Sequence, residues 1–358
     1  MPEDARDYYS ELYQKTMKKN IPFVGQWELN TNCNLNCYHC YLGRQRQCYG
    51  LPLVKIKSIL DELADLGTLY LSFTGGEILL RKDFFEIAGY SRKKNFAIRL
   101  LTNATLIDED AADKINALNP LSVDVSLYAL NPVIHDRITG MIGSQELVIR
   151  AIKLLRKREI KVVVKTLFMK ENLAEFNPIK YFCQDNGVEF QFDFTMTPAD
   201  DGSIDVSRLG LEKSQIEDVF SENNILVSRR QDASLDALLC AAGINSFFIS
   251  SSGNLYPCIF LKKNMGSLLR ERFQEIWNSS NFNNFRAIDA QDFYNCRQCG
   301  LVGYCNHCMG LSLLEHGNLL GASSLDCRLA LVFKNVYEKR RSKYGEEKEE
   351  LSETSSHL

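Results

Sequence analysis

Cysteine is the feature that most constrains this chain, because 12 of its 358 residues are cysteines. Seven of them lie in three tight groups, Cys33-x3-Cys37-x2-Cys40, Cys296-x2-Cys299 and Cys305-x2-Cys308. The first residues, MPEDARDYYS, lack the basic patch and apolar core of a signal peptide, so we expect a cytoplasmic protein. A chain of this length in a reducing compartment has little need of disulfides. The cysteines therefore predict metal ligation.

The composition excludes several classes of protein. With 45% hydrophobic and 24% charged residues, the chain has the make-up of a folded protein and not of a disordered one. Its net charge of -3 gives no general attraction to nucleic acid or to an anionic membrane. Apolar runs such as Leu69–Phe73 are far shorter than the roughly 20 residues that span a bilayer. We expect neither nucleic acid nor a membrane as a partner.

Residues 26 to 195 alternate short β-rich runs with segments of helical period, the pattern of repeated βα units around a parallel sheet. The predicted strands are Trp27–Leu29, Leu69–Thr74, Ala97–Leu101, Ser122–Leu127, Val162–Phe168 and Glu189–Phe194. The predicted helices lie near 53–66, 83–95, 108–117, 144–158 and 173–186, the fourth with Leu147, Ala151, Leu154 and Leu155 on its buried face. We predict an α/β fold, a partial (β/α)6 TIM-like barrel with its reactive groups at the C-terminal strand ends.

The remaining chain divides by composition. We expect an N-terminal extension over 1–24, the barrel over 25–196 and a connecting segment over 197–238, which opens with the turn-rich Thr197–Ser203. A cysteine-rich domain is expected over 239–330, held together more by metal than by apolar burial. Residues 331–358 end in a charge run from Glu338 onward, which is typical of a solvated, partly disordered tail.

Cys33, Cys37 and Cys40 directly follow the first predicted strand. Three thiolates can bind three irons of a cubane 4Fe-4S cluster and leave the fourth iron open to an exogenous ligand. The alternative is a zinc site that His39 or a distant side chain completes. The sequence CNLNCYHCY resembles the C-x3-C-x2-C signature of radical S-adenosylmethionine (SAM) enzymes, a superfamily that has this partial barrel. The resemblance implies a SAM-binding cluster.

Further segments extend the resemblance and imply SAM contacts. Thr74–Glu77 is similar to the GGE motif, in which Gly75, Gly76 and Glu77 receive the SAM amino group; Ile78 stands where the family commonly has proline. The turn TNATL contains Asn103, a further implied SAM contact. Ser126 is an implied ribose partner and Arg137 an implied carboxylate partner, whereas we interpret His135 as structural. In this family, the cluster cleaves SAM to a 5′-deoxyadenosyl radical that abstracts a substrate hydrogen.

Seven cysteines follow, in the pattern Cys240-x12-Gly253-x4-Cys258, Cys296-x2-Cys299-x5-Cys305-x2-Cys308 and Cys327. Paired C-x2-C groups alone favour a zinc ribbon. After a radical SAM barrel, the array resembles the SPASM domain, which implies two auxiliary 4Fe-4S clusters. By position, the first auxiliary cluster would be bound by Cys240, Cys258 and Cys308 and would lack a fourth cysteine. The second auxiliary cluster would be bound by Cys296, Cys299, Cys305 and Cys327. The assignments of Cys305 and Cys308 could be exchanged. We interpret Cys48 as a loop thiol and Cys183 as a core residue.

The resemblance implies an enzyme that modifies a ribosomally made precursor peptide by crosslinking, epimerisation or excision, with an electron donor such as flavodoxin or ferredoxin. Alternatives are a tetrapyrrole substrate, sulfatase-type protein maturation, or a zinc-stabilised binding module. The sulfatase-maturing branch has Asp after the second ligand of the first auxiliary cluster, where this chain has Ile259. Asp193 is the candidate catalytic carboxylate. Only some 25 residues precede the first strand, so we expect leader binding by a separate small protein or at a sheet edge.

Overall fold

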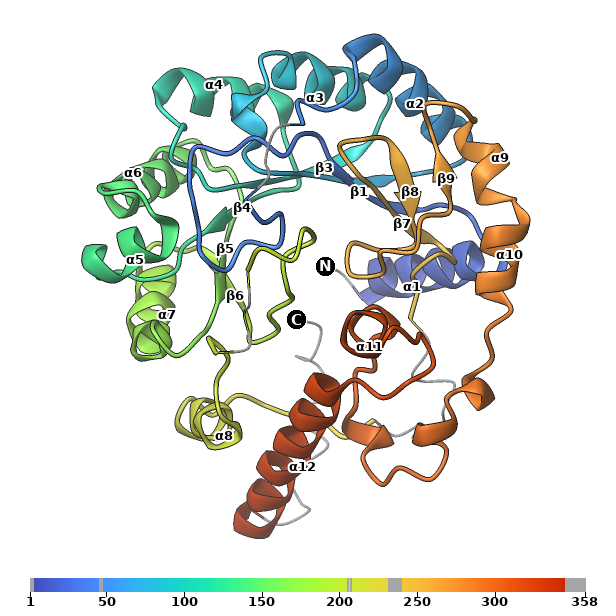
Figure 1. The fold of residues 1–358 in the computed structure, drawn as a ribbon. Helices are drawn as coiled ribbons and strands as arrows, with labels where there is room; N and C mark the ends of the chain where they lie inside the picture. The colour runs from blue at the N-terminus through green and yellow to red at the C-terminus, as the bar shows by residue number, and fades with distance from the viewer. Residues whose placement is uncertain (1–2, 45–47, 205, 207, 231–239, 345–358) are drawn as a thin grey trace.

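The computed structural model describes residues 3–44, 48–204, 206, 208–230 and 240–344. Six parallel strands form one side of the molecule in the order β6-β5-β4-β3-β2-β1, which confirms the predicted α/β partial barrel (Figure 1). Their bounds are β1 Val24–Glu28, β2 Tyr70–Thr74, β3 Ala97–Thr102, β4 Ser122–Ser126, β5 Val162–Leu167 and β6 Glu189–Asp193. All six predicted strands are present, the first beginning three residues early.

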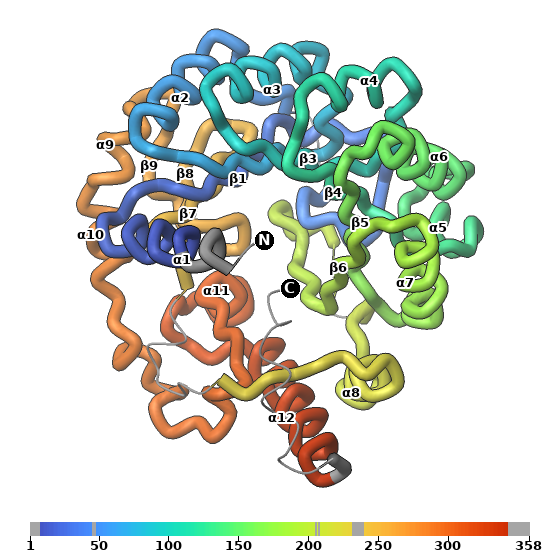
Figure 2. The backbone as a smooth tube through the Cα atoms, turned by 180° about the vertical axis from the view of Figure 1, so that it is seen from behind, coloured from blue at the N-terminus to red at the C-terminus, as the bar shows by residue number. Residues whose placement is uncertain are grey.

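Helices follow the strands and lie on the outside of the sheet, as the two opposite views show (Figures 1 and 2). The five predicted helices are α2 Leu53–Asp65, α3 Phe84–Lys93, α4 Glu109–Leu118, α6 Ser144–Lys157 and α7 Phe176–Asp185. In α6 the buried apolar side chains are Val148, Ala151, Ile152 and Leu155, so the buried face is turned by about one residue from the predicted one. An additional short helix, α5 Pro132–Thr139, begins after Asn131, whose side chain accepts a hydrogen bond from Val133 N.

The sheet does not end with the barrel. Strand β7, Ser246–Ile249, pairs in parallel with β1, and β8 Asn254–Tyr256 and β9 Gly266–Ser267 continue the sheet in antiparallel pairing. Strand β1 therefore lies between β2 of the barrel and β7 of the cysteine-rich region. No strand was predicted for Ser246–Ile249. The barrel and the cysteine-rich region share one sheet of nine strands within the described residues.

The remaining helices lie before and after the barrel. They are α1 Glu3–Lys18, α8 Lys213–Glu222, α9 Phe273–Trp277, α10 Ser280–Arg286, α11 Met309–His316 and α12 Ser324–Tyr344, with 3-10 turns at Ile78–Leu80, Leu173–Glu175, Ala290–Asp292, Tyr294–Cys296 and Val302–Tyr304.

The C-terminal region contains more helix than predicted. Helix α12 packs on α8 through Phe333 and Phe220, whose ring centroids are 5.4 Å apart, and buries Val332 and Val336. The charge run from Glu338 onward was expected to be solvated and partly disordered; it is helical as far as Tyr344, with Glu338 and Lys339 exposed. Residues 345–358 lie outside the described ranges.

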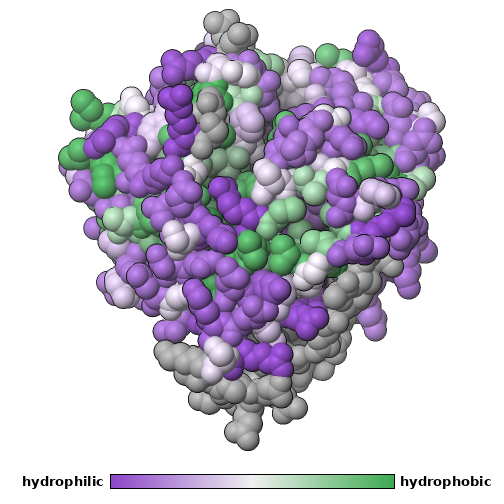
Figure 3. All heavy atoms as spheres, turned by 60° about the horizontal axis from the view of Figure 1, so that its bottom comes forward, coloured by the Kyte–Doolittle hydropathy of each residue, from purple (hydrophilic) through white to green (hydrophobic). Residues whose placement is uncertain are grey.

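In the face that Figure 3 shows, hydrophilic side chains predominate and hydrophobic ones gather in small patches. Among the helices of the described ranges, none combines the length and the apolar character that crossing a bilayer requires.

The buried face of α6 supplies a test of the packing. Leu155 is fully buried, whereas Lys153 on the same helix is exposed. Leu155→Ala removes apolar contacts and leaves a cavity, so we expect a loss of about 2–5 kcal/mol in the free energy of unfolding. Lys153→Ala is the matched control and should change it by less than about 0.5 kcal/mol. Anaerobic urea titrations of the two variants measure the difference, and equal stabilities would contradict the α6 packing.

Candidate active site and cluster sites

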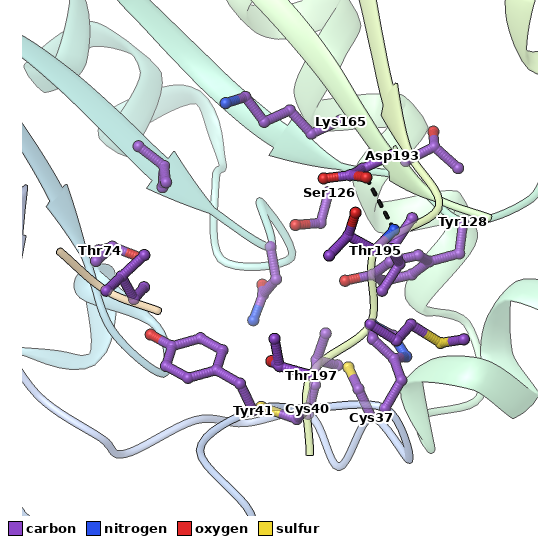
Figure 4. A pocket seen from close by; sticks show the side chains of 18 of the residues that line it. Cys37, Cys40, Tyr41, Thr74, Ser126, Tyr128, Lys165, Asp193, Thr195 and Thr197 are labelled. Atoms are coloured by element: carbon purple, nitrogen blue, oxygen red, sulfur yellow. Dashed lines mark hydrogen bonds between the residues drawn. The ribbon is translucent and has the colours of Figure 1, made fainter. Parts of the chain in front are cut away.

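A cavity of about 490 Å³ lies at the C-terminal ends of the barrel strands, where the partial-barrel prediction placed the reactive groups. Residues from β2 to β6 line it, and Ile259, Phe260 and Leu314 of the cysteine-rich region close one side. Cys33, Cys37 and Cys40 all line this cavity, and Figure 4 shows Cys37 and Cys40 there. The two regions of the chain thus form one cavity together.

The loop that carries the three cysteines is held in place by hydrogen bonds. Asn36 N donates to Thr139 O at 2.8 Å, at the end of α5. The Cys33 Sγ accepts hydrogen bonds from Leu35 N at 3.4 Å and from the Asn103 side-chain amide at 3.7 Å. Donors directed at sulfur stabilise a thiolate, the form that binds iron. This loop therefore fits an iron-sulfur cluster that three cysteines hold.

Two glycines let the loop after β2 lie against the loop after β1. Gly75 has φ +149°, and a Cβ atom at this position would lie 2.3 Å from Asn30 O. A Cβ atom on Gly76 would lie 2.2 Å from Asn32 O. Gly76 N donates to Asn30 O at 3.0 Å, so the two backbones are in direct contact. Both glycines line the cavity, and only glycine permits this approach.

Glu77 has a different place from the other two residues of the motif. Its side chain is fully buried and is not among the residues that line the cavity. The carboxylate accepts hydrogen bonds from Leu79 N at 3.1 Å, Thr102 Oγ1 at 2.7 Å and Asn103 N at 2.8 Å. Burial raises its pKa, and these three donors act against that rise. Contact of Glu77 with SAM stays a prediction; in the structure the carboxylate holds the loop that directs Asn103 to Cys33.

The other predicted SAM contacts fall in two places. Asn103 and Ser126 line the cavity. Arg137 lies outside the cavity lining, with a side chain that is 61% exposed and forms an ion pair with Glu171 at 3.1 Å. The structure therefore brings Asn103 and Ser126 to the three cysteines but not the guanidinium of Arg137. The carboxylate-binding role of Arg137 stays a prediction.

Asp193 ends β6 and lines the cavity (Figure 4). One oxygen of its carboxylate accepts hydrogen bonds from Phe194 N at 2.7 Å and Thr195 N at 2.8 Å. These bonds fix the turn that follows the strand and direct the carboxylate toward the cavity. The catalytic role of Asp193 stays a prediction.

An ion pair on the cavity wall was not found from the sequence. Lys165 Nζ of β5 lies 3.0 Å from Asp124 Oδ2 of β4, and the side chain of Asp124 is only 3% exposed. Ser122 Oγ donates to the other carboxylate oxygen at 2.6 Å. A signal was present, because Asp124 and Lys165 are charged residues inside runs that otherwise read as buried strands. Such residues occur in a sheet interior when they face a polar cavity.

A second ion pair joins the segment that follows the barrel to the cysteine-rich region. Lys262 Nζ lies 2.9 Å from Asp200 Oδ2 and 5.0 Å from the centre of the Phe248 ring. It also lies 5.5 Å from the ring centre of Tyr41, the residue after Cys40. Both members of the ion pair line the cavity. Cation–π contact and the aspartate together fix the ammonium group at the cavity edge.

The seven later cysteines lie in two neighbouring groups, and no disulfide joins any of the twelve cysteines, all of which are described. Cys296, Cys299, Cys305 and Cys327 line one small hollow. Burial and the nearby Cys240 raise the pKa of Cys258. Burial, together with the neighbouring Asp326 and Cys258, raises the pKa of Cys308 to about 11. Cys305 thus lies with the group of four, and Cys308 with Cys258. This arrangement fits the assignment by position, and the individual ligand roles stay predictions.

The two groups of cysteines are adjacent. The Asp326 carboxylate accepts a hydrogen bond from Cys308 N at 2.7 Å and also lines the hollow of the group of four. Cys258 Sγ accepts one from Phe260 N at 3.3 Å, which again favours a thiolate. Within the described ranges, no three His, Cys, Asp or Glu side chains meet in the way that a single metal ion needs.

The two cysteines without an assigned ligand role lie apart. Cys183 of α7 is buried among apolar residues, and burial raises its pKa to about 12, in agreement with the core position predicted from the sequence. Cys48 exchanges backbone and side-chain hydrogen bonds with Thr31 and does not line the cavity.

The fold and the site together are those of radical SAM proteins. This class has the partial barrel, the three-cysteine loop after the first strand and the glycine motif after the second. The family model for the radical SAM superfamily matches residues 27–180, and the model for the SPASM iron-sulfur cluster-binding domain matches residues 240–300. The chain is therefore a radical SAM enzyme with a SPASM domain, with SAM and 4Fe-4S clusters as its cofactors. When bound, these cofactors supply a radical that abstracts hydrogen. We predict that the residues described above would hold them.

Curated relatives extend over most of the chain. An AdoMet-dependent heme synthase of Methanosarcina barkeri is 28% identical over 325 residues, which are 81% of this chain and 91% of the relative. The subtilosin biosynthesis protein AlbA of Bacillus subtilis is 26% identical, covering 86% of this chain and 76% of the relative. The mycofactocin maturase MftC of Mycobacterium tuberculosis is 26% identical, covering 81% and 78%.

Solved structures have the same fold. SuiB of Streptococcus suis bound to SAM superposes with a TM-score of 0.68 at 17% identity, covering 91% of this chain and 82% of SuiB. The structure of anSMEcpe with bound AdoMet gives a TM-score of 0.68 at 19% identity, covering 90% of this chain and 98% of anSMEcpe. At these identities the likeness establishes the fold alone.

The contact at Gly76 gives a prediction for SAM binding. In Gly76→Ala the added methyl group would collide with the backbone of Asn32, so the two loops must separate. We expect at least a tenfold loss of SAM affinity, measured by anaerobic equilibrium dialysis. Gly89→Ala is the matched control, because its added methyl group meets only Leu118 at 4.0 Å. Unchanged SAM binding by Gly76→Ala would contradict the role of this contact.

Buried His135 predicts a pH dependence of stability. The ring is fully buried with Nδ1 3.0 Å from Ser144 Oγ, and burial lowers its pKa to about 4. The folded pKa is below the unfolded value of about 6.5, so this contribution is complete above pH 6.5 and is lost as pH falls toward 4. Between pH 6.5 and 5, the free energy of unfolding should fall by about 2 kcal/mol more in the wild type than in His135→Asn. Parallel slopes in urea titrations would contradict this account.

Proposed function

We propose that this enzyme modifies a peptide substrate. The observation that carries the proposal is the character of the cavity lining. Both lysines that line the cavity, Lys165 and Lys262, are ion-paired with aspartates of the same lining. Much of the remaining polar lining consists of neutral hydrogen-bonding side chains, among them Thr74, Thr102, Asn103, Ser126, Thr166, Gln191, Thr195 and Thr197. Peptide groups are neutral and need such donors and acceptors, whereas a substrate rich in carboxylates needs available cations.

The relatives support this proposal. AlbA and MftC, a biosynthesis protein for subtilosin and a maturase for mycofactocin, resemble this chain over most of its length. SuiB, which shares the fold, has been solved in complex with a precursor peptide. On this proposal, the precursor segment enters between the barrel and the cysteine-rich region, whose Phe260 and Leu314 complete the cavity.

Asp193 is the side chain that we assign to proton transfer from the substrate. It stands at the carboxyl end of β6 on the cavity wall and is exposed there, so a substrate group can approach it. The two backbone N–H groups that bind one of its oxygens fix the carboxylate during the transfer. Ile259 stands where the sulfatase-maturing branch has its own carboxylate, which makes that reaction the less favoured one.

A tetrapyrrole substrate is the second candidate function. It is favoured by the heme synthase of Methanosarcina barkeri, which matches this chain over 91% of its own length. The paired state of Lys165 and Lys262 opposes it, because a tetrapyrrole carries carboxylates that would have to displace Asp124 and Asp200.

A leader segment and an electron donor complete the proposal. Strand β6 is one end of the sheet, and an apolar hollow beside it is lined by Phe190, Phe192 and Ile225. An extended leader could add to this strand and insert apolar side chains into the hollow, or a separate small protein could present it. We assign electron supply to a flavodoxin or ferredoxin, as the chemistry of the clusters requires a reductant.

The test is anaerobic reconstitution with SAM and dithionite, with precursor peptides encoded beside the gene as one substrate and iron-coproporphyrin as the other. We expect 5′-deoxyadenosine and a mass change in a peptide only. Cys33→Ala should remove the activity, because it removes one of the three predicted ligands of the SAM-binding cluster. Porphyrin turnover without peptide turnover would establish the second candidate, and peptide turnover that survives Cys33→Ala would contradict the mechanism.

The role of Asp193 predicts a separation of two products. Asp193→Asn should lower modified peptide by at least tenfold, since a general base contributes on the order of 100-fold or more, while 5′-deoxyadenosine still forms. Asp185→Asn, an exposed change at the end of α7, is the matched control and should leave both products unchanged. An equal loss of both products in Asp193→Asn would indicate a structural role instead.

A further inference from the structure

His307 lies between Cys305 and Cys308, in the loop before α11. Its side chain lines the small hollow that Cys296, Cys299, Cys305 and Cys327 also line. The residue is only 5% exposed, and its ring meets Phe293 edge to face with the centroids 4.7 Å apart. The imidazole is therefore held in one place at the wall of the four-cysteine hollow.

The Nε2 atom of this ring is buried and has no hydrogen-bond partner within the described residues. A buried polar atom that leaves its hydrogen bond unmade costs about 1–3 kcal/mol, so such atoms commonly point to a missing partner. Apart from Asp326, the hollow is otherwise lined by apolar residues, Leu301, Val302, Ala322 and Ala330. Asp326 already accepts a hydrogen bond from Cys308 N. Besides the Asp326 carboxylate, the acceptors among the side chains that line the hollow are the four cysteine sulfur atoms.

We propose that His307 donates a hydrogen bond from Nε2–H to a sulfur atom of the second auxiliary 4Fe-4S cluster. The four cysteines provide the complete ligand set of a cubane cluster, so the imidazole has no ligand position to fill. Thiolate and sulfide sulfur atoms accept hydrogen bonds, and donors to them are a main means by which proteins adjust a cluster. His307 is thus a positioning residue that tunes this cluster and does not touch the substrate.

The expected effect follows from charge. Reduction adds one negative charge to the cluster, so a hydrogen bond to its sulfur is stronger in the reduced state than in the oxidised state. His307 therefore raises the reduction potential of the second auxiliary cluster. Its removal should make this cluster harder to reduce and should change the potential of the first auxiliary cluster much less, because Cys240, Cys258 and Cys308 do not line the hollow of His307.

The test uses the full-length protein with Cys33, Cys37 and Cys40 all changed to alanine, so that the auxiliary clusters alone contribute to the spectrum. Potentiometric titration followed by EPR should show one auxiliary potential lowered in His307→Leu. The reduced fraction at a fixed potential should fall about tenfold, which is 59 mV for a one-electron couple. His307→Gln keeps a side-chain N–H donor and should show a smaller shift. His316→Leu, a half-exposed histidine outside the hollow, is the matched control and should show none.

Two outcomes would overturn the proposal. The first is that both auxiliary reduction potentials stay unchanged in His307→Leu, although the variant contains as much iron and sulfide as the protein without this substitution. The other is the absence of a histidine nitrogen coupling in pulsed EPR spectra of the reduced parent protein labelled with 15N-histidine. This second measurement needs no destabilising variant, so it decides the question if His307→Leu fails to retain its clusters. Loss of the coupling in His307→Gln would support the proposal.

Discussion

The parallel pairing of β1 with two strands at once is the constraint on which the rest of this structure depends. Strand β1 pairs with β2 on one side and with β7 on the other, and the cysteine loop follows directly from it. Because the carboxyl ends of parallel strands lie at one edge of a sheet, the loop must stand between the barrel cavity and the cysteine-rich region. The position of the reactive site is therefore a result of strand order.

The sequence predicted the features that are local in the chain. Six strands and five helices came from hydrophobic period, because parallel strands buried on both faces read as continuous apolar runs. The cysteine groups came from spacing, since ligands two or three residues apart must share a site. In both cases the physical cause and its signal lie within a few residues of each other.

What the sequence did not predict depends on distant partners. Glu77 is buried outside the cavity lining, where Thr102 and Asn103 donate hydrogen bonds to it, and Arg137 is paired with Glu171. The pairing of Phe247 and its neighbours with β1, and the packing of α12 on α8, join segments far apart in the chain. No period or spacing reports such contacts. A charge run such as the one after Glu338 can equally be the outer face of a helix.

The shared sheet has a consequence for how such enzymes can be recombined. Chain order suggests a joint between the barrel and the cysteine-rich region at about residues 197 to 238, but the ladder between β1 and β7 crosses that joint. A chimera that exchanges everything after this joint must replace β7 with a strand that fits β1 in register, or the new sheet will be mismatched beside the cysteine loop. The true unit of exchange is the set of strands around β1, and linker position is a poor guide to it.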